Sequence, residues 1–197
     1  MARTPSTMRL APGDAAPAFD LPNLNRSAGA ERVSLDRAAG EAGLLVMFIC
    51  NHCPFVIHVA DELAKLGHYA TSHGIGVVAV MPNDVKNFPD DSPDRMAAEA
   101  ENRGYTFPYL FDEDQSVAKA YAAACTPDFF LFGPDRTLYY RGQLDGSRPG
   151  NDEPVTGADL RAAISDMLAG QPASDAQTPS MGCNIKWIPG NEPDYFG

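Results

Sequence analysis

Four cysteines, Cys50, Cys53, Cys125 and Cys183, are the side chains of this sequence best suited to covalent chemistry. The N-terminal residues lack the apolar stretch of an export signal, so we expect a cytoplasmic protein in a reducing compartment. In such a compartment, cysteines are more often free thiols, metal ligands or catalytic groups than parts of a structural disulfide framework. The surroundings of each thiol therefore decide what chemistry to expect from it.

Cys53 lies between a predicted buried strand, the apolar run 44–49, and a predicted helix that begins at Pro54. Proline suits the first helical position, which makes Cys53 the N-cap residue. The unpaired N–H groups of Phe55 and Val56 and the positive end of the helix dipole then favour the thiolate. Such a position lowers a cysteine pKa from about 8.5 to about 3.5–7.5. We therefore expect Cys53 to be an exposed nucleophile at the carboxyl edge of a parallel sheet.

The residues around Cys53 allow more than one interpretation. Cys50 ends the apolar strand, where a cysteine is typically a small buried hydrophobe. His52, if protonated, favours the Cys53 thiolate, but its ring can equally point to solvent. Cys50, His52, Cys53 and Cys125 are also zinc-ligand types, although adjacent residues such as 52 and 53 rarely direct both side chains at one ion. We expect no metal site and no cofactor.

The elements that must position these groups follow from the hydrophobic pattern. Apolar spacing of three and four residues predicts helices, and short apolar runs predict strands. The first two strands and the helix between them form a βαβ unit, which predicts parallel strands and a right-handed crossover. The expected strands are 44–49, 75–81, 108–111, 128–132 and 137–140, and the expected helices are 54–74, 92–104, 115–124 and 156–168.

The pattern indicates one domain of 197 residues with an elaboration at each end. Residues 1–43 form an N-terminal extension with two short apolar pieces that fit edge strands, and residues 44–169 form the core. Residues 170–197 are rich in Pro, Ser, Asn and Gly, yet they also contain Ile185 and Trp187. A disordered segment rarely carries so much apolar surface, so we expect an irregular tail that docks on the domain.

Charge and hydropathy argue against two kinds of partner. The chain has 15 Lys and Arg against 26 Asp and Glu, a net charge of -11. This balance repels nucleic-acid phosphates and anionic lipids. The longest apolar runs, 44–50 and 75–81, are far shorter than the roughly 18–20 residues that span a bilayer. We therefore expect neither a nucleic-acid partner nor a membrane partner.

Four segments that together span nearly the whole chain carry a resemblance to a known family. They are Gly13–Leu21, Asn51–Phe55, Cys125–Phe130 and Pro179–Trp187. In this order they resemble the thioredoxin-like superfamily and, more closely, the peroxiredoxin-like branch of the alkyl hydroperoxide reductase/thiol-specific antioxidant (AhpC/TSA) group. The resemblance implies a thioredoxin-like α/β fold, in which helices flank a central mixed β-sheet and a cis proline, Pro127, faces the reactive Cys53. The residues then expected to contact substrate are Pro54, Thr126, Pro127 and His52.

The chain departs from that family at positions that matter chemically. Val56 stands where thioredoxins carry the second cysteine of Cys-x-x-Cys, and Cys50 stands where peroxiredoxins carry the threonine that binds peroxide. The peroxiredoxin arginine is missing from its usual place, which leaves Arg141 or Arg136 as substitutes. These departures favour a slower thiol chemistry over a fast peroxidase.

We therefore predict a thiol-dependent oxidoreductase in which Cys53 attacks a peroxide or a disulfide. Cys125, Cys183 or Cys50 then resolves the intermediate, because a second thiol condenses with a sulfenic acid to give a disulfide. An external thiol or a thioredoxin-like reductant would supply electrons, and the resemblance allows a homodimer. The alternative class is a non-catalytic binding module that holds an extended peptide in the groove at Pro127.

Overall fold

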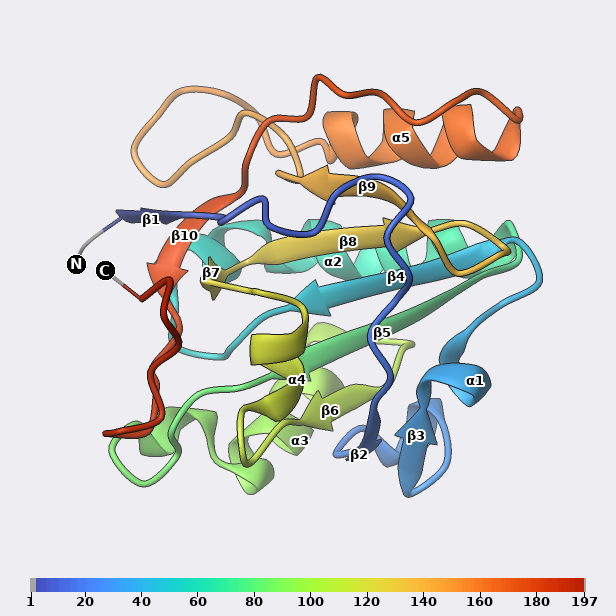
Figure 1. Cartoon of the computed structure of the whole chain (residues 1–197). Coiled ribbons are helices and arrows are strands. Elements are labelled where there is room, and N and C mark those ends of the chain that lie inside the picture. Colours follow the sequence, from blue (N-terminus) through green and yellow to red (C-terminus); the bar gives the residue numbers. More distant parts are fainter. Residues whose placement is uncertain (1–2, 197) are drawn as a thin grey trace.

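The computed structural model describes residues 3–196 and has a five-stranded mixed sheet at its centre (Figure 1). The strand order is β6-β5-β4-β8-β9. Strands β4, β5 and β6 are parallel, whereas β8 runs antiparallel to both β4 and β9. The bounds are β4 Gly43–Phe48, β5 Ile75–Met81, β6 Tyr109–Phe111, β8 Asp128–Phe132 and β9 Leu138–Gly142.

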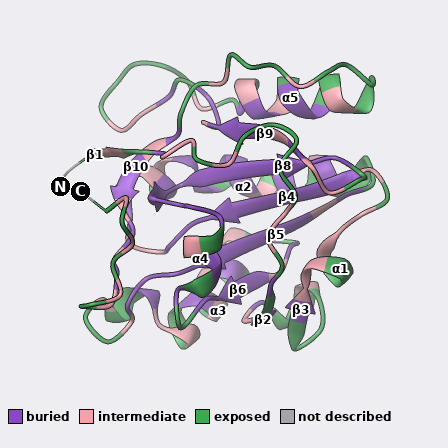
Figure 2. Ribbon diagram, in the orientation of Figure 1, coloured by how far each residue is buried: buried purple, intermediate pink, exposed green. Residues whose placement is uncertain are grey.

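Both faces of this sheet are buried, as the continuous apolar runs predict (Figure 2). Successive side chains of a strand point to opposite faces, so Met47 of β4 joins one core and its neighbour Val46 joins the other. Residues of α2 (Pro54–Ser72), α3 (Pro93–Arg103) and α5 (Ala158–Leu168) complete the core of Met47. Residues of α4 (Ser116–Ala120) and of both terminal segments complete the core of Val46.

The predictions for the three long helices are confirmed, and the prediction for α4 is wrong in length. Proline at the first position begins both α2 and α3. Helix α4 covers only Ser116–Ala120 of the expected 115–124. The alanine-rich sequence favours a longer helix, but Ala122 adopts a φ of 49°, in the left-handed region, which ends the helical path.

The N-terminal extension contributes short elements beside the central sheet. Its two apolar pieces form β2 (Asp20–Pro22) and β3 (Arg32–Ser34), which pair with each other and not with an edge of the central sheet. The short helix α1 (Leu35–Ala38) follows, and single 3-10 turns cover Arg26–Ala28 and Pro89–Asp91. An isolated bridge between Asn23 and Leu110 connects this extension to β6.

The C-terminal segment docks on the domain as expected, but it is not wholly irregular. Residues Met181–Asn184 form strand β10, which lies between β1 (Arg3–Pro5) and β7 (Cys125–Thr126) in a separate three-stranded sheet (Figure 1). Ile185 and Trp187 then enter the core of Val46. The tail therefore belongs to the folded domain and lies against the strand that precedes Pro127. None of the helices in residues 3–196 has the length and hydropathy of a bilayer-spanning segment.

Candidate active site

Cys53 caps the N-terminus of α2, directly before Pro54, as the sequence predicts. Its side chain is completely buried, so the expected exposure at the sheet edge is wrong. The covering groups come from β7 and from the tail strand β10. In its thiol form, Cys53 Sγ donates to the carbonyl oxygen of Thr126 at 3.1 Å.

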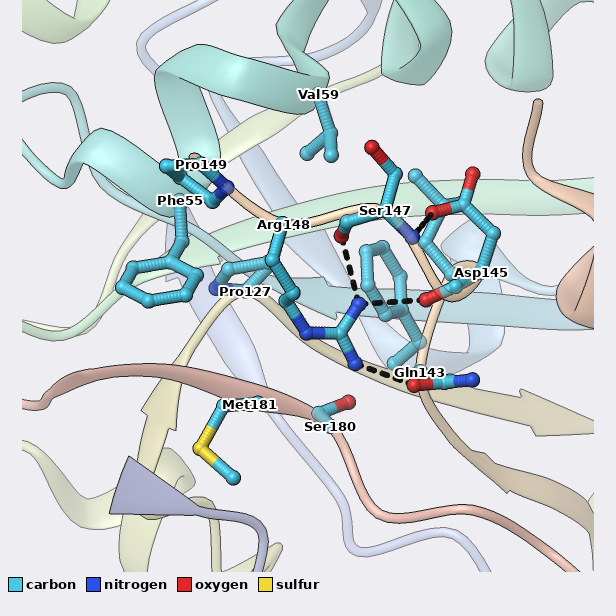
Figure 3. A pocket seen from close by; sticks show the side chains of 12 residues that line it. Phe55, Val59, Pro127, Gln143, Asp145, Ser147, Arg148, Pro149, Ser180 and Met181 are labelled. Carbon is cyan, nitrogen blue, oxygen red and sulfur yellow. Dashed lines mark hydrogen bonds between the residues drawn. The ribbon is translucent and has the colours of Figure 1, made fainter. Parts of the chain in front are cut away.

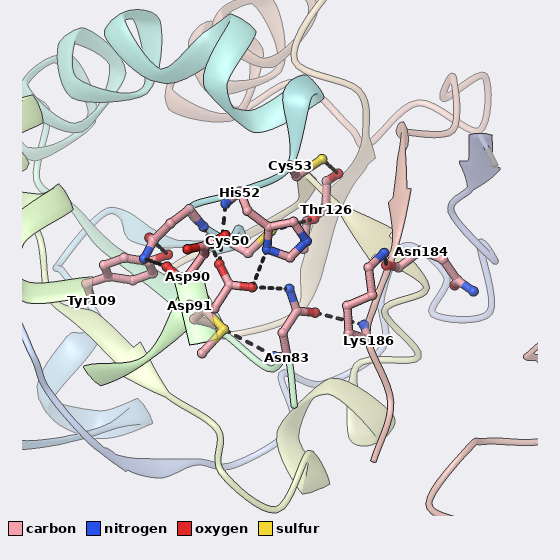
Figure 4. Close-up of polar contacts among 12 residues, drawn as sticks. Cys50, His52, Cys53, Asn83, Asp90, Asp91, Tyr109, Thr126, Asn184 and Lys186 are labelled. Carbon is pink, nitrogen blue, oxygen red and sulfur yellow. Dashed lines mark hydrogen bonds and ion pairs between the residues drawn. The ribbon is translucent and has the colours of Figure 1, made fainter. Parts of the chain in front are cut away.

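Strand pairing brings Cys183 to the same place. Residues Cys183 and Thr126 lie directly opposite each other in the antiparallel pair of β10 and β7. Opposed residues project their side chains to the same face of a sheet. Thr126 Oγ1 lies 3.3 Å from Cys50 Sγ on that face (Figure 4). The thiols of Cys50, Cys53 and Cys183 therefore form one buried cluster, which we call the sulfur cluster.

The sulfur cluster stabilises a negative charge on Cys53. Hydrogen bonds from the thiols of Cys183 and Cys50, in that order, lower the pKa of Cys53 to about 2, against the opposing effect of burial. The backbone N–H of Val56 adds a smaller contribution. The same hydrogen bonds raise the pKa of Cys50 and of Cys183. The thiols of Cys183 and Cys50 are thus the main cause of the low pKa of Cys53, and the amides of the helix end, which the sequence suggested for that role, come second.

His52 is held by a buried carboxylate beside the cluster. His52 Nδ1 lies 2.6 Å from Oδ2 of Asp91, and the imidazole stacks on Phe88 with ring centroids 5.7 Å apart. The hydrogen bond to Asp91 raises the pKa of His52, and the negative charge on Cys53 acts in the same direction. Both effects favour the protonated form of the His52 ring.

The four residues of zinc-ligand type do not come together in one candidate metal site, because Cys53 and Cys125 are not part of the group described next. Within residues 3–196, the one group of metal-ligand type comprises Cys50, His52 and Asp91, whose ligand atoms lie within 4.8 Å of one another. The Asp91 carboxylate already accepts hydrogen bonds from the N–H groups of Asn51 and His52, from Asn83 Nδ2 and from the His52 ring. A carboxylate with four such contacts is part of a hydrogen-bond network, which leaves it poorly placed to hold a cation.

Cys125 belongs to a different cluster. It precedes Thr126 in β7, so its side chain points to the opposite face of the strand. Burial raises the pKa of its thiol, and the nearby charges of Asp128 and Arg141 also act on it. Arg141 is fully buried and pairs with Asp128, with Nη2 3.6 Å from Oδ2. Arg136 instead pairs with Asp36 on the surface.

The expected substrate residues surround the cluster at different depths. The Thr126–Pro127 peptide bond is cis, as the resemblance implies. Pro54 is exposed, His52 is half-buried, and Thr126 and Pro127 are buried. Pro127 also lines a pocket whose apolar lining includes Phe55, Val59 and Met181 and whose polar lining includes Arg148 (Figure 3).

Two residues of the site were missed by sequence reasoning. Asp91 lies in a short turn before α3, and Asn83 follows β5. The position of Asn83 carried a signal, because polar residues after parallel strands gather at the carboxyl edge of the sheet. Asp91 carried none, because the turn Pro89–Asp91 reaches the loop of Cys53 only through tertiary packing.

The fold and the buried thiols define a thioredoxin-like protein with a cysteine at the start of the first long helix. The AhpC/TSA family model matches residues 12–141, and the chain belongs to that family. It is 34% identical over 118 residues to “Putative peroxiredoxin Rv2521” of Mycobacterium tuberculosis, a match that covers 59% of this chain and 67% of that protein. The family match ends before β10, so it does not include Cys183.

Solved structures show the same architecture. An uncharacterized conserved protein from Geobacillus kaustophilus is 48% identical, with a TM-score of 0.91 over 96% of this chain and 98% of that chain. A hypothetical protein from Sinorhizobium meliloti 1021 is 47% identical, with a TM-score of 0.88 over 94% of this chain and 98% of that chain. Peroxidoxin BcpB from Mycobacterium tuberculosis, 17% identical with a TM-score of 0.58 over 82% of this chain and 98% of that chain, shares the fold. These likenesses confirm the thioredoxin-like prediction.

Proposed function

We propose that this protein is a thiol oxidoreductase in which Cys53 attacks the substrate and Cys183 resolves the intermediate. The observation that carries the proposal is the sulfur cluster, in which the Cys183 thiol is the principal support of the Cys53 thiolate. Thiolate, not thiol, is the nucleophile in peroxide and disulfide chemistry. The AhpC/TSA family supports the same reaction class.

The chemistry balances with a hydroperoxide as oxidant. The Cys53 thiolate attacks the terminal oxygen, the O–O bond breaks, and the departing alkoxide or hydroxide takes up a proton. The product is Cys53 sulfenic acid. The Cys183 sulfur then attacks the sulfenic sulfur, the S–O bond breaks, and water leaves with the Cys183 proton. An external thiol, such as a thioredoxin-like reductant in the cytoplasm, then reduces the disulfide by exchange.

Cys183 is preferred over the other two thiols for geometric reasons. Cys125 projects from the opposite face of β7, where its neighbours are Asp128 and Arg141. Cys50 donates to Cys53 as well, but its sulfur is also engaged by Thr126 Oγ1. We therefore assign Cys50 the role of second hydrogen-bond donor.

The alternative binding module receives less support from this geometry. An extended peptide would bind by pairing with the strand that precedes the cis proline, since β-strand addition needs a free strand edge. In this chain β10 already pairs with β7 at Cys125 and Thr126. The strand edge that the alternative needs is therefore occupied by the chain's own tail.

Intact mass after one equivalent of hydrogen peroxide tests the proposal. We expect the wild type to lose the mass of two hydrogen atoms, and peptide mapping to join Cys53 to Cys183. Cys53→Ser should not form this link, and Cys125→Ser should form it normally. A wild type that forms no disulfide with hydrogen peroxide, or with a small disulfide such as oxidised dithiothreitol, would contradict the proposal.

A further inference from the structure

A buried carboxylate fixes the loop that carries Cys53. The Asp91 side chain has no exposed surface. Its Oδ1 accepts the backbone N–H of Asn51 at 2.8 Å and that of His52 at 3.4 Å, and its Oδ2 accepts the His52 ring. Both backbone groups belong to the residues directly before Cys53. Asp91 therefore holds the path of the chain as it enters the sulfur cluster.

Asn83 connects the same carboxylate to the tail that carries Cys183. Its Nδ2 donates to Asp91 Oδ2 at 2.8 Å, and its Oδ1 accepts the backbone N–H of Lys186 at 2.8 Å (Figure 4). Lys186 lies three residues after Cys183, and Asn83 is buried. Together with the Asp91 carboxylate, this side-chain amide thus links the two distant segments that supply the two sulfurs.

The backbone around Asn83 strengthens this bridge. The N–H of Asp84 donates to the carbonyl oxygen of Lys186 at 2.8 Å, so adjacent residues hold both polar groups of the Lys186 backbone. On its other side, Cys183 is held by its pairing with Thr126. The segment between these two anchors is short, so its freedom to move the Cys183 sulfur is small.

Two sulfurs form a bond only within a narrow range of distances and angles. Misplacement of a reacting group by about 1 Å can cost about 100-fold in rate. We propose that Asp91 and Asn83 are positioning residues for the redox pair, Asp91 for the loop of Cys53 and Asn83 for the tail of Cys183. This assignment rests on the proposed function. Neither residue supplies a group to the sulfur chemistry itself.

The experiment separates the two steps of the reaction in Asn83→Ala and in a matched control. Asn191→Ala is the control, because Asn191 anchors the same tail farther along, through Asp114 O at 3.1 Å and Gln115 Oε1 at 2.9 Å. The first readout is the rate at which iodoacetamide alkylates reduced Cys53. The second is the rate at which the Cys53–Cys183 disulfide follows sulfenic acid formation by hydrogen peroxide.

We expect Asn83→Ala to slow disulfide formation about 10-fold while alkylation changes by less than about twofold. Asn191→Ala should leave both rates near those of the wild type. Equal disulfide rates in Asn83→Ala and the wild type would overturn the assignment, and so would equal slowing in both variants. If Asn83→Ala does not fold, Asp91→Asn has nearly the same size and replaces one carboxylate oxygen with an NH2 group, so either the loop of Cys53 or Asn83 loses its acceptor. Slower disulfide formation supports the assignment, and an unchanged rate overturns it. A wild type that forms no Cys53–Cys183 disulfide would instead contradict the proposed function.

Discussion

Strand β7 consists of two adjacent residues, Cys125 and Thr126, whose side chains point to opposite faces with different surroundings. Thr126 faces the sulfur cluster, in which two thiol donors lower the pKa of Cys53. Cys125 faces Asp128 and Arg141, a fully buried ion pair. Both faces hold cysteine, buried charge and little solvent, yet only one has an arrangement that lowers the pKa of a thiol.

In this chain, hydrogen-bond donors, more than burial or proximity to Pro127, decide whether the pKa of a buried cysteine is lowered. Burial alone raises a thiol pKa, as it does for Cys125. Cys53 is at least as inaccessible, but its donors outweigh the desolvation. On the face of Cys125, the buried charges of Asp128 and Arg141 are paired with each other and with Ser6.

The largest expected effect is on peroxide-driven disulfide formation, which should depend on the face of the sulfur cluster and not on the face of Cys125. Cys53→Ser should abolish peroxide-driven disulfide formation, because it removes the one thiolate of the sulfur cluster. Cys125→Ser should change the rate by less than about twofold, because its thiol lies on the other face. Stopped-flow mixing with peroxide followed by mass mapping measures both. Loss of disulfide formation in Cys125→Ser would contradict the claim that only the face of the sulfur cluster takes part in the reaction.

The next effect concerns stability on the face of Cys125. Arg141→Met should lower the free energy of unfolding by about 3–5 kcal/mol, because Asp128 would be left buried without its cation. Burial already raises the pKa of Asp128, and Arg141 opposes that rise. Urea denaturation measures the change, and the pH dependence of Cys53 alkylation should stay as in the wild type. A variant as stable as the wild type would show that the ion pair contributes nothing net.

A smaller effect tests the cover of the sulfur cluster. A Cβ placed on Gly182 would lie 2.1 Å from the carbonyl oxygen of Thr126, so Gly182→Ala must move β10 away from β7. We expect faster alkylation of Cys53 and slower disulfide formation, with a stability loss of about 1–3 kcal/mol. Differential alkylation and urea denaturation measure these changes. Slower alkylation would mean that β10 does not limit access to Cys53.

The smallest effect is a pH dependence that comes from His52. The Asp91 contact raises the pKa of His52 above its ordinary value of about 6.5. Its stabilising contribution is therefore fully present below about pH 6.5 and is lost as the pH rises through the raised value. His52→Gln should lower the free energy of unfolding by on the order of 1 kcal/mol at pH 6 and by less at pH 9. A larger decrease in the free energy of unfolding at pH 9 than at pH 6 would contradict a raised pKa of His52.

Sequence reasoning located the main elements because their signals are local. Short apolar runs predict β4 and β5, and prolines predict the starts of α2 and α3. Each of these signals lies within a few residues. The same local logic placed Cys53 at a helix N-terminus. It could not show that the sulfur is buried, because the cover comes from a tail more than 100 residues later in the chain.

The remaining parts of the site depend on tertiary contacts that no local pattern encodes. The tail looked irregular because β10 is short and its partners are the equally short β1 and β7. Asp91 looked like any acidic turn residue until packing brought it to the loop of Cys53. The choice between Cys125 and Cys183 depended on which face of β7 each sulfur occupies, and the register of two distant strands sets that face.

The pH dependence of Cys53 alkylation by iodoacetamide tests the central claim most directly. Because the Cys183 and Cys50 thiols lower the pKa of Cys53 to about 2, the rate should stay nearly constant between about pH 5 and pH 8. Cys183→Ala, which removes the principal donor, should raise the midpoint toward that of an ordinary thiol. A wild-type rate that climbs about 10-fold per pH unit toward a midpoint near 8.5 would contradict the account, because Cys53 would then behave as an ordinary thiol.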